Sequence, residues 1–418
     1  MSVHEPTQVV VLGGGYTAVW AARALARGLR RRLRDGSVRV TVVSSSTTHA
    51  FHGWTGEVLS GHVRGERART ALVDLVPAAW VLHGCATALD TVTRTVAVTT
   101  DEGVRLLPYH HLLVATGSRD ARERVPGLAE HGWSLKDDGG LDALVGRLDG
   151  GAGPAVVVGG GLAGTEAAVA MAARLRREDP EARVVLVHGG DRVLPELRPR
   201  FERVARYALE QAGRAGVDVR CGARVVRVDD GVVVLDDGST IPAGTVVSAV
   251  GQRVVTLPGL AADRAADGRL VTDRLLRTSI DGVWAGGDGA AVPQPNGSGP
   301  CPPNALWALK AGTRVGRNIA RTVRGRPARA FRFPGLGQAA SLGVGRGAAE
   351  LYGVQLTGWA AWLTRWVFFH AFMPSRRVAL AAMGDWLVLG LRTLGGRRAV
   401  AHATRGAVSN TGTLDAAV

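Results

Sequence analysis

Lysine and cysteine are scarce in this sequence of 418 residues. Only Lys136 and Lys310 are lysines among 51 basic residues, so arginine carries almost all of the positive charge. We attribute this bias to a GC-rich genome rather than to chemistry. The three cysteines, Cys85, Cys221 and Cys301, are widely scattered. Their spacing excludes a disulfide framework, a CxxC redox pair and a cysteine zinc site, and we expect no metal site.

Long hydrophobic runs are also missing. No uninterrupted apolar stretch reaches the length of about 18 residues that a transmembrane helix needs. The first apolar run, Val9 to Leu12, leads into glycines, and no signal-peptide pattern opens the chain. We therefore expect a cytoplasmic location, at most peripheral on the inner face of the cell membrane. With 46% hydrophobic and 21% charged residues, the chain should form two or three globular domains.

Glycine is abundant, with 57 residues, and it marks an internal repeat. A short apolar strand at residues 8–12 ends at Gly13-Gly14-Gly15, and a predicted helix follows from Tyr16 to about Leu33 before the next strand. The same order returns at residues 155–187 around Gly159-Gly160-Gly161. The repeat predicts an α/β fold with two Rossmann-like dinucleotide-binding domains.

Each unit contains the pattern of a phosphate-binding loop. In Gly13-x-Gly15-x-x-Ala18 and Gly159-x-Gly161-x-x-Gly164, the first glycine makes the turn and the second lets the backbone approach a pyrophosphate. The third small residue lets the helix pack against the strand, and the helix N-terminus stabilises the phosphate charge. Two such loops predict two dinucleotide sites.

The order of these units suggests that the second domain is inserted in the first. We expect a first domain at 1–122 and 253–345, a second at 123–252, and a C-terminal amphipathic, helical segment at 346–418. Within them we expect a hairpin turn at Asp236-Asp237-Gly238, a helix from about Asn304 to Arg324, a strand pair in 331–345, mainly helix over 355–392, and a frayed end from Gly395.

Two further segments resemble motifs of flavoproteins with two dinucleotide-binding domains. Val114-Ala115-Thr116-Gly117-Ser118 resembles their ATG strand, and Thr278 to Gly289 resembles their second FAD motif, whose aspartate is here Asp288. Within the pyridine nucleotide-disulfide oxidoreductase superfamily, the chain looks like the type II NADH dehydrogenases (NADH:quinone oxidoreductases) over about residues 8–392. That likeness also rests on Gly164-Thr165-Glu166, on Pro302-Pro303-Asn304-Ala305 opening a helix, and on a C-terminal stretch from Trp359 to Trp386 that contains His370.

The resemblance implies an FAD-dependent oxidoreductase that takes hydride from NAD(P)H and passes electrons to a quinone or another small acceptor. FAD would then contact Gly13, Gly15, Ala18, Ser44, Ala115, Thr116, Gly117, Asp288, Asn304 and Ala305, and NAD(P)H would contact Gly159, Gly161, Gly164 and His188. Glu166 would lie beside the isoalloxazine, where it could orient nicotinamide or relay protons. The alternative for Glu166 is a first-turn acid that only favours the helix dipole.

Four positions depart from the family pattern. Ser44 and His188 stand at strand ends where an acid usually binds the adenosine ribose. His188 with Arg192 could form a weakly basic subsite that tolerates NADPH, or His188 could merely cap its strand. Leu306 and Ala311 stand where quinone-tunnel glutamines are expected.

These departures keep other functions open. A soluble flavin reductase acting on a small molecule or an iron–sulfur protein is the first alternative, and a non-catalytic flavin-binding sensor or scaffold is the second. The resemblance also extends to sulfide:quinone oxidoreductases, which use paired cysteines at the flavin. Cys301 precedes the flavin-facing helix, but without a neighbouring cysteine we expect it to be a core or loop residue.

The positive charge is concentrated near the C-terminus. Residues 301–418 hold 16 basic and three acidic residues out of a net charge of +15 for the whole chain. No zinc-finger, RNP or basic-zipper pattern accompanies the charge, so we expect no nucleic-acid partner. Helical spacing places Trp359, Trp362, Trp366 and Phe369 on one face. We expect this face to contact an anionic membrane surface; the alternatives are a homodimer contact and an ordinary solvated basic surface.

Overall fold

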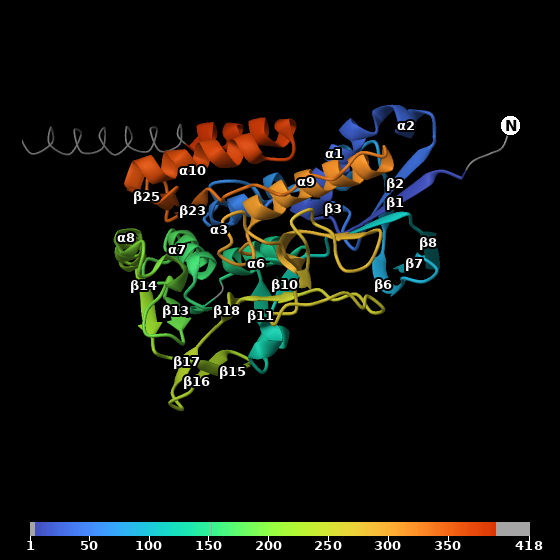
Figure 1. Ribbon diagram of the computed structural model, residues 1–418. Helices are drawn as coiled ribbons and strands as arrows, with labels where there is room; N and C mark the ends of the chain where they lie inside the picture. Colours follow the sequence, from blue (N-terminus) through green and yellow to red (C-terminus); the bar gives the residue numbers. More distant parts are fainter. Residues whose placement is uncertain (1–4, 152, 390–418) are drawn as a thin grey trace, which may run out of the picture.

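The computed structural model describes residues 5–151 and 153–389. Two parallel five-stranded sheets each contain one glycine-rich unit (Figure 1). The first has the order β21 (Val283–Ala285), β9 (His111–Val114), β1 (Thr7–Leu12), β2 (Val38–Ser44), β5 (Trp80–His83). The second has the order β11 (Gly132–Ser134), β18 (Thr245–Ser248), β12 (Ala155–Val158), β13 (Val184–His188), β14 (Val217–Cys221). The expected α/β fold with two Rossmann-like units is confirmed.

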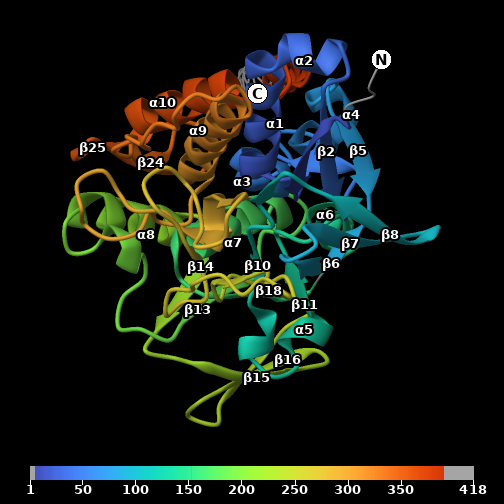
Figure 2. The same cartoon turned by 45° about the vertical axis from the view of Figure 1, so that its right-hand side comes forward.

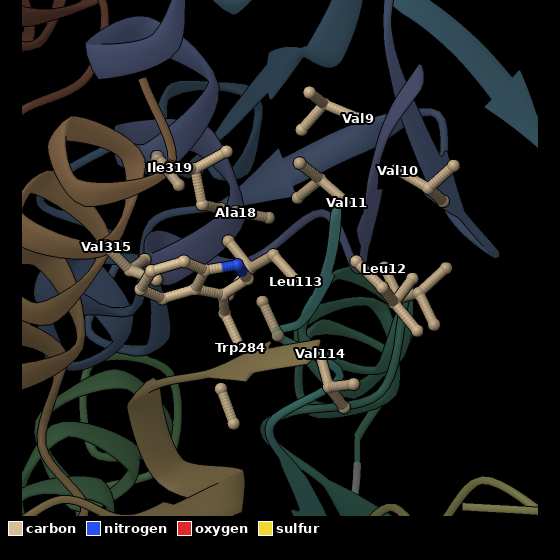
Figure 3. Close-up of a cluster of buried hydrophobic side chains, with 14 of the residues drawn as sticks. Val9, Val10, Val11, Leu12, Ala18, Leu113, Val114, Trp284, Val315 and Ile319 are labelled. Atoms are coloured by element: carbon tan, nitrogen blue, oxygen red, sulfur yellow. The ribbon is translucent and has the colours of Figure 1, made fainter. Parts of the chain in front are cut away.

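Helices α1 (Tyr16–Gly28) and α9 (Ala305–Val323) cover the first sheet and pack against each other. Two glycines on α9 allow this close approach, because a Cβ on Gly312 or Gly316 would lie 2.8 Å from the Cα of Thr17 or Ala21. Figure 3 shows Val315 and Ile319 of α9 beside Ala18 of α1 and the buried valines of β1. The two helices are therefore held in a fixed relation, and both begin at the same end of the sheet.

The second unit is built in the same way. Helix α7 (Leu162–Leu175) follows β12, and α6 (Gly140–Asp149) and α8 (Glu202–Arg214) lie near it. All four residues of β12 are buried, as expected for a parallel strand covered on both faces. Antiparallel pairing of β10 (Ser118–Asp120) with β19 (Gln252–Val254) joins the chain where it enters and leaves this unit.

Smaller elements complete the molecule. The antiparallel sheets are β6 (Cys85–Asp90), β7 (Thr95–Thr100) and β8 (Gly103–Pro108); β15 (Val225–Asp229), β16 (Val232–Leu235) and β17 (Thr240–Pro242); β23 (Gly337–Ser341), β24 (Gly347–Leu351) and β25 (Val354–Thr357); and the pair β3 (Thr48–Ala50) and β4 (Arg69–Ala71). The remaining strands are the parallel pair β20 (Leu270–Val271) and β22 (Ala290–Ala291), and the other helices are α2 (Arg30–Arg34), α3 (Thr55–Leu59), α4 (Leu72–Leu75), α5 (Leu128–His131) and α10 (Gly358–Phe372).

Three local expectations differ from the structure. The first helix ends at Gly28 because Leu29 has a non-helical backbone, and α2 continues the segment to Arg34. The Asp236-Asp237-Gly238 turn joins β16 to β17 rather than to the strand at 245–248, which pairs in the parallel sheet. Residues 331–345 supply only β23, whose partner β24 lies beyond them, so residues 347–357 are strands rather than helix.

The C-terminal segment folds onto the rest of the molecule as two helices, α10 and helical residues 376–389. Asp385, which is nearly buried, accepts salt bridges from Arg64 and Arg67 and so holds the second helix in place. Expectations for residues 390–418, including the frayed end, lie outside the described residues. Within the described part of the chain, no helix is long and apolar enough to cross a membrane.

Only part of the predicted aromatic face of α10 is exposed to solvent. Trp366 and Phe369 pack against the buried core, where the Phe369 ring makes edge contacts with Phe51 and Trp54. Arg365, one of the basic residues of this C-terminal region, is 4% exposed. Most of the exposed apolar side chains of the two helices lie outside the predicted face, which contributes only Trp359. We call these exposed side chains the apolar strip: Trp359, Leu363, Val367, Leu380, Met383, Leu387 and Val388.

Candidate active site

The first glycine loop leaves a helix end free for an anion. Gly13 has a φ of +116°, and a side chain there would collide with the backbone of Ala115 on the neighbouring strand. Gly15 is the N-cap of α1, and no side chain caps this end. A Cβ at Gly15 would meet nothing within 4 Å, while Ala18 is fully buried. Unpaired backbone N–H groups beside open space fit a dinucleotide pyrophosphate.

The other predicted FAD contacts surround this loop. Ser44 is buried at the end of β2, where its Oγ accepts a hydrogen bond from Ser46 N (3.2 Å). Thr116 Oγ1 donates to Val255 O (3.2 Å), and Gly117 has a φ of +66°. Asp288 accepts from Ser118 Oγ (3.2 Å), so a carboxylate stands where the second FAD motif requires it.

Lys136 was not predicted as a site residue, but it lies in this group. Its Nζ is 3.2 Å from Ser118 Oγ and 3.9 Å from the Asp288 carboxylate. Burial lowers the pKa of Lys136, and Asp288 opposes this effect. The sequence signal was weak: Lys136 is one of only two lysines in a chain that otherwise uses arginine.

Helix α9 opens at the predicted residues. Asn304 is its N-cap, and Asn304 Oδ1 accepts from Leu306 N (2.8 Å). One of the free N–H groups of this helix end is thus already occupied, and Ala305 begins the helix beside it. Thr17 Oγ1 of α1 donates to Ala308 O (3.1 Å), which links the two helix starts.

The second glycine loop repeats the first, with one addition. Gly159 has a φ of +116° and lies against the backbone of Ala249, and Gly164 packs directly on the Gly159 carbonyl. Gly161 is the N-cap of α7, but here Glu196 Oε1 accepts from Leu162 N (3.3 Å). A carboxylate therefore stands at the helix end that a cofactor pyrophosphate would need.

The surroundings of His188 differ from a basic subsite. Its Nδ1 accepts a hydrogen bond from Gly160 N (3.3 Å), so the ring supports the glycine loop. Arg192 pairs with Glu202 (2.5 Å), and Arg198 binds the same carboxylate. Arg192 is thus held by Glu202, which it shares with Arg198, and His188 still borders the loop.

A cavity of about 440 Å³ lies between the starts of α1 and α9, the strand β23 and helix α10. Most of its lining is apolar, with Phe51, Leu306, Leu309, Leu336, Phe368, Phe369 and Phe372. The polar side chains are few: Tyr16, His52, Glu166, Asn304, Gln338, Thr364 and Arg365. Of the two positions where glutamines were expected, Leu306 lines the cavity, whereas Ala311 is buried outside it.

Glu166 belongs to a buried cluster of three charges. Arg365 donates to Glu166 Oε1 (2.6 Å) and to Glu57 Oε1 (2.5 Å), and Ser341 N also donates to Glu166 (3.0 Å). Burial raises the pKa of Glu166 to about 7; Arg365 lowers it and the Glu57 carboxylate raises it. Two carboxylates share one guanidinium, so this acid can change protonation near neutral pH. The helix-dipole alternative does not account for these contacts.

Neither Glu57 nor Arg365 was predicted as a site residue. Glu57 lies on the short helix α3, and Arg365 lies 308 residues further on, so no local pattern connects them. Arg365 Nε has no hydrogen-bond partner in the described part of the chain, although the residue is buried beside the cavity.

His52 also lines the cavity and is exposed to it. Cys301 is buried, and burial raises the pKa of its thiol to about 12. A protonated thiol is a poor nucleophile, in agreement with a packing role. No cluster of potential metal ligands occurs among residues 5–151 and 153–389.

Two glycine-rich loops that each begin a helix, the Asp288 carboxylate beside Ser118 and an apolar cavity at the same sheet ends define an FAD-dependent NAD(P)H oxidoreductase. Comparison with known proteins agrees. The chain belongs to the pyridine nucleotide-disulphide oxidoreductase family, whose model matches residues 7–311.

Relatives of the chain include an NADH dehydrogenase-like protein and a type II NADH:quinone oxidoreductase. An NADH dehydrogenase-like protein of Mycobacterium tuberculosis is 34% identical over 307 residues, which cover 68% of this chain and 73% of that protein. The type II NADH:quinone oxidoreductase NdhA of the same organism is 27% identical over 91% of this chain and 86% of its own length. The structure of NDH2 from Plasmodium falciparum in complex with NADH superposes with a TM-score of 0.78, at 14% identity, over 91% of this chain and 97% of that one.

A protein named for a different reaction is similar to the chain at a comparable sequence identity. A NAD-dependent persulfide reductase from A. fulgidus has a TM-score of 0.70 and 25% identity, and the match covers 82% of this chain but 63% of that protein. The shared fold therefore serves different electron acceptors.

Proposed function

We propose that this oxidoreductase transfers electrons from NAD(P)H to a quinone bound in the 440 Å³ cavity. The observation that carries the proposal is the lining, which is mainly aromatic and aliphatic and also contains hydrogen-bonding side chains, among them Gln338 and the Glu166–Arg365 pair. Such a cavity fits a planar, lipophilic molecule with carbonyl groups. The similarity to a type II NADH:quinone oxidoreductase supports this acceptor class.

The residues around the glycine loops would hold the two cofactors. FAD would lie along the first loop, with Ser44, Asp288 and the start of α9 at Asn304 and Ala305, and NAD(P)H along the second loop near His188. Bound FAD supplies the redox chemistry, accepting hydride from NAD(P)H and delivering electrons to the acceptor. The division of the chain into domains at residues 122 and 252 belongs to the same proposal.

The chain itself would orient the acceptor and supply protons. Gln338 replaces the missing helix glutamines, since its amide borders the cavity from β23. The free Arg365 Nε offers a second donor for an acceptor carbonyl. Glu166, with a pKa of about 7, would take up or release a proton as the acceptor is reduced.

The proposal also includes contact with a membrane. We infer that the apolar strip, rather than the predicted aromatic face, lies in the interface of the cytoplasmic membrane. A lipophilic acceptor would then reach the cavity along α10, which lines it. A homodimer that covers the strip is the competing arrangement, and a soluble reductase for an iron–sulfur protein is the competing function.

The test follows flavin reduction by NADH and by NADPH in a stopped-flow instrument, and then reoxidation by a short-chain quinone. We expect bleaching by the nucleotide and fast reoxidation. Gln338→Leu should raise the KM for quinone about tenfold, the equivalent of about 1.4 kcal/mol for one lost hydrogen bond. Gln294→Leu, in the exposed loop 293–303, is the control. Reoxidation by an iron–sulfur protein but not by quinone would refute the proposal, and absence of bleaching would favour the scaffold.

A further inference from the structure

A second charged surface lies away from the cavity, at the far ends of α1 and α9. It consists of arginines on three neighbouring segments, and we call it the arginine cluster: Arg27, Arg30, Arg31, Arg32, Arg34, Arg321, Arg324 and Arg326. Arg32 donates to Val323 O (2.6 Å) and Arg324 to Gly28 O (3.4 Å), so α2 and the end of α9 form one continuous surface. None of the residues of α2 is buried.

The cluster has almost no compensating charge. Among the described residues, no carboxylate forms a salt bridge with any of its eight arginines. Asp35 follows α2, but it accepts its hydrogen bond from Ser37 N (2.9 Å). Repulsion from Arg329, Arg326 and Arg324 adds to desolvation in lowering the pKa of Arg321. A concentration of like charge that destabilises its own members indicates an anionic partner.

The arginine cluster adjoins the two C-terminal helices. Arg23 of α1 donates to Pro374 O (2.7 Å) in the turn between those helices, and the same Arg23 is close enough to Arg27 for their charges to repel. Figures 1 and 2 both show α2 and α10 at the same, upper end of the molecule, opposite β15. The apolar strip and the arginine cluster thus belong to one side of the protein.

The position of the cluster argues against a redox partner. Helix α9 begins at the cavity and has 19 residues, so its far end lies about 28 Å from the cavity. An acidic electron-transfer protein seated on the arginines would not contact the site that it must exchange electrons with. A broad anionic surface does not need to reach the cavity, because it only has to contact the arginine cluster and the apolar strip.

We propose that the arginine cluster binds the anionic headgroups of a lipid bilayer and, together with the apolar strip, sets the tilt of the protein on the membrane. The proposal rests on the membrane contact proposed above and adds a lipid selectivity to it. The strip alone would bind any bilayer, whereas the cluster makes binding depend on anionic lipid. The mouth of the cavity on α10 would then be held at the interface.

The test uses the full chain with its flavin, in flotation with neutral vesicles and with vesicles containing 30% anionic lipid (about one lipid in three). The variant Arg30→Gln/Arg31→Gln/Arg34→Gln changes three exposed side chains of α2, and glutamine keeps the helix propensity of this segment. Each base near an anionic surface contributes about 1 kcal/mol, or about fivefold in partition. We expect partition onto anionic vesicles to fall on the order of 100-fold at low salt, with no change on neutral vesicles.

Two controls separate local from general charge. Arg105→Gln/Arg220→Gln/Arg227→Gln removes the same charge on β8, β14 and β15, and should leave partition within a few-fold of the wild type. Arg30→Lys/Arg31→Lys/Arg34→Lys keeps the charge and should bind as the wild type does. Equal losses in both glutamine variants would overturn the proposal, as would a loss of binding to duplex DNA without a loss on vesicles.

The two proposals can fail separately. Quinone reduction by the arginine variant in solution should match that of the wild type, because the cluster is remote from the cavity. Leu363→Gln/Leu380→Gln tests the strip, and should weaken binding to both kinds of vesicle. Wild-type protein that floats with anionic lipid but does not reduce quinone would refute the function and leave the surface standing. Wild-type protein that never floats would refute the lipid-binding surface and the membrane contact, and would leave the proposed quinone reduction standing.

Discussion

Removing the charge of Glu166 should change how stability depends on pH. In the folded protein burial raises the pKa of this acid from its ordinary 4.5 to about 7. Between these values the folded state holds a proton that the unfolded chain has lost. Because the folded state then binds more protons, the free energy of unfolding decreases as pH rises from about 4.5 to about 7 and levels off above that.

The size of the effect follows from the pKa. The rise to about 7 corresponds to about 3 kcal/mol of stability that is present at pH 4.5 and lost by pH 8. Glu166→Gln keeps the shape of the protonated acid but cannot ionise. Relative to the wild type, the variant should therefore gain about 3 kcal/mol as the pH is raised through this range.

Urea denaturation followed by tryptophan fluorescence, at half-unit steps of pH, measures the difference. Glu210→Gln on the exposed face of α8 is a matched control, and it should show no such trend. A wild-type minus Glu166→Gln difference that is constant with pH would refute the reasoning, and so would a transition centred near 4.5. The same variant should lose the pH dependence of quinone reduction near 7 while keeping its flavin.

Three other substitutions probe the cofactor sites. Asp288→Ala should purify largely without flavin, measured as absorbance per protein, and full flavin content would contradict its assignment. His188→Glu should move the NADH-to-NADPH ratio of kcat/KM toward NADH, while the wild-type preference should stay below about a hundredfold, or about 2.7 kcal/mol. Glu196→Gln removes the negative charge at the start of α7 and should lower the KM for NADH up to about fivefold at constant kcat, in keeping with about 1 kcal/mol for a charge at a helix end. An unchanged or higher KM would show that Glu196 moves aside without cost.

The parts that could be predicted depend on neighbours in sequence. Gly13 and Gly159 both adopt a φ of +116°, a conformation that glycine alone tolerates well. Each loop can therefore be recognised from its own short stretch of sequence. Strand and helix periodicity around them then places β1, α1, β12 and α7. Asn304 could be recognised in the same way, because a cap residue directly precedes the helix that it caps.

The cluster around Glu166 could not be predicted, because its members meet only through tertiary packing. Glu57 and Arg365 are 308 positions apart, and each looks like an ordinary helical charge in its own segment. The burial of part of the aromatic face of α10 could not be predicted for a related reason. Helical spacing tells which side chains share a face, but it does not say whether protein, lipid or water covers that face, and here Phe51 and Trp54 cover part of it.

Arg365 also changes what deleting the C-terminal helices would mean. Cutting the chain after Gly353 would remove the guanidinium that is bonded to both Glu57 and Glu166, and would leave two carboxylates facing each other in the interior. Loss of one partner from a buried ion pair costs about 3–5 kcal/mol, in addition to any lost packing. A truncated protein that no longer binds vesicles would therefore report on a damaged redox centre as much as on a missing anchor. The proposed membrane binding therefore has to be tested by surface substitutions, because the same helices that face outward also hold Glu166 in place beside the cavity.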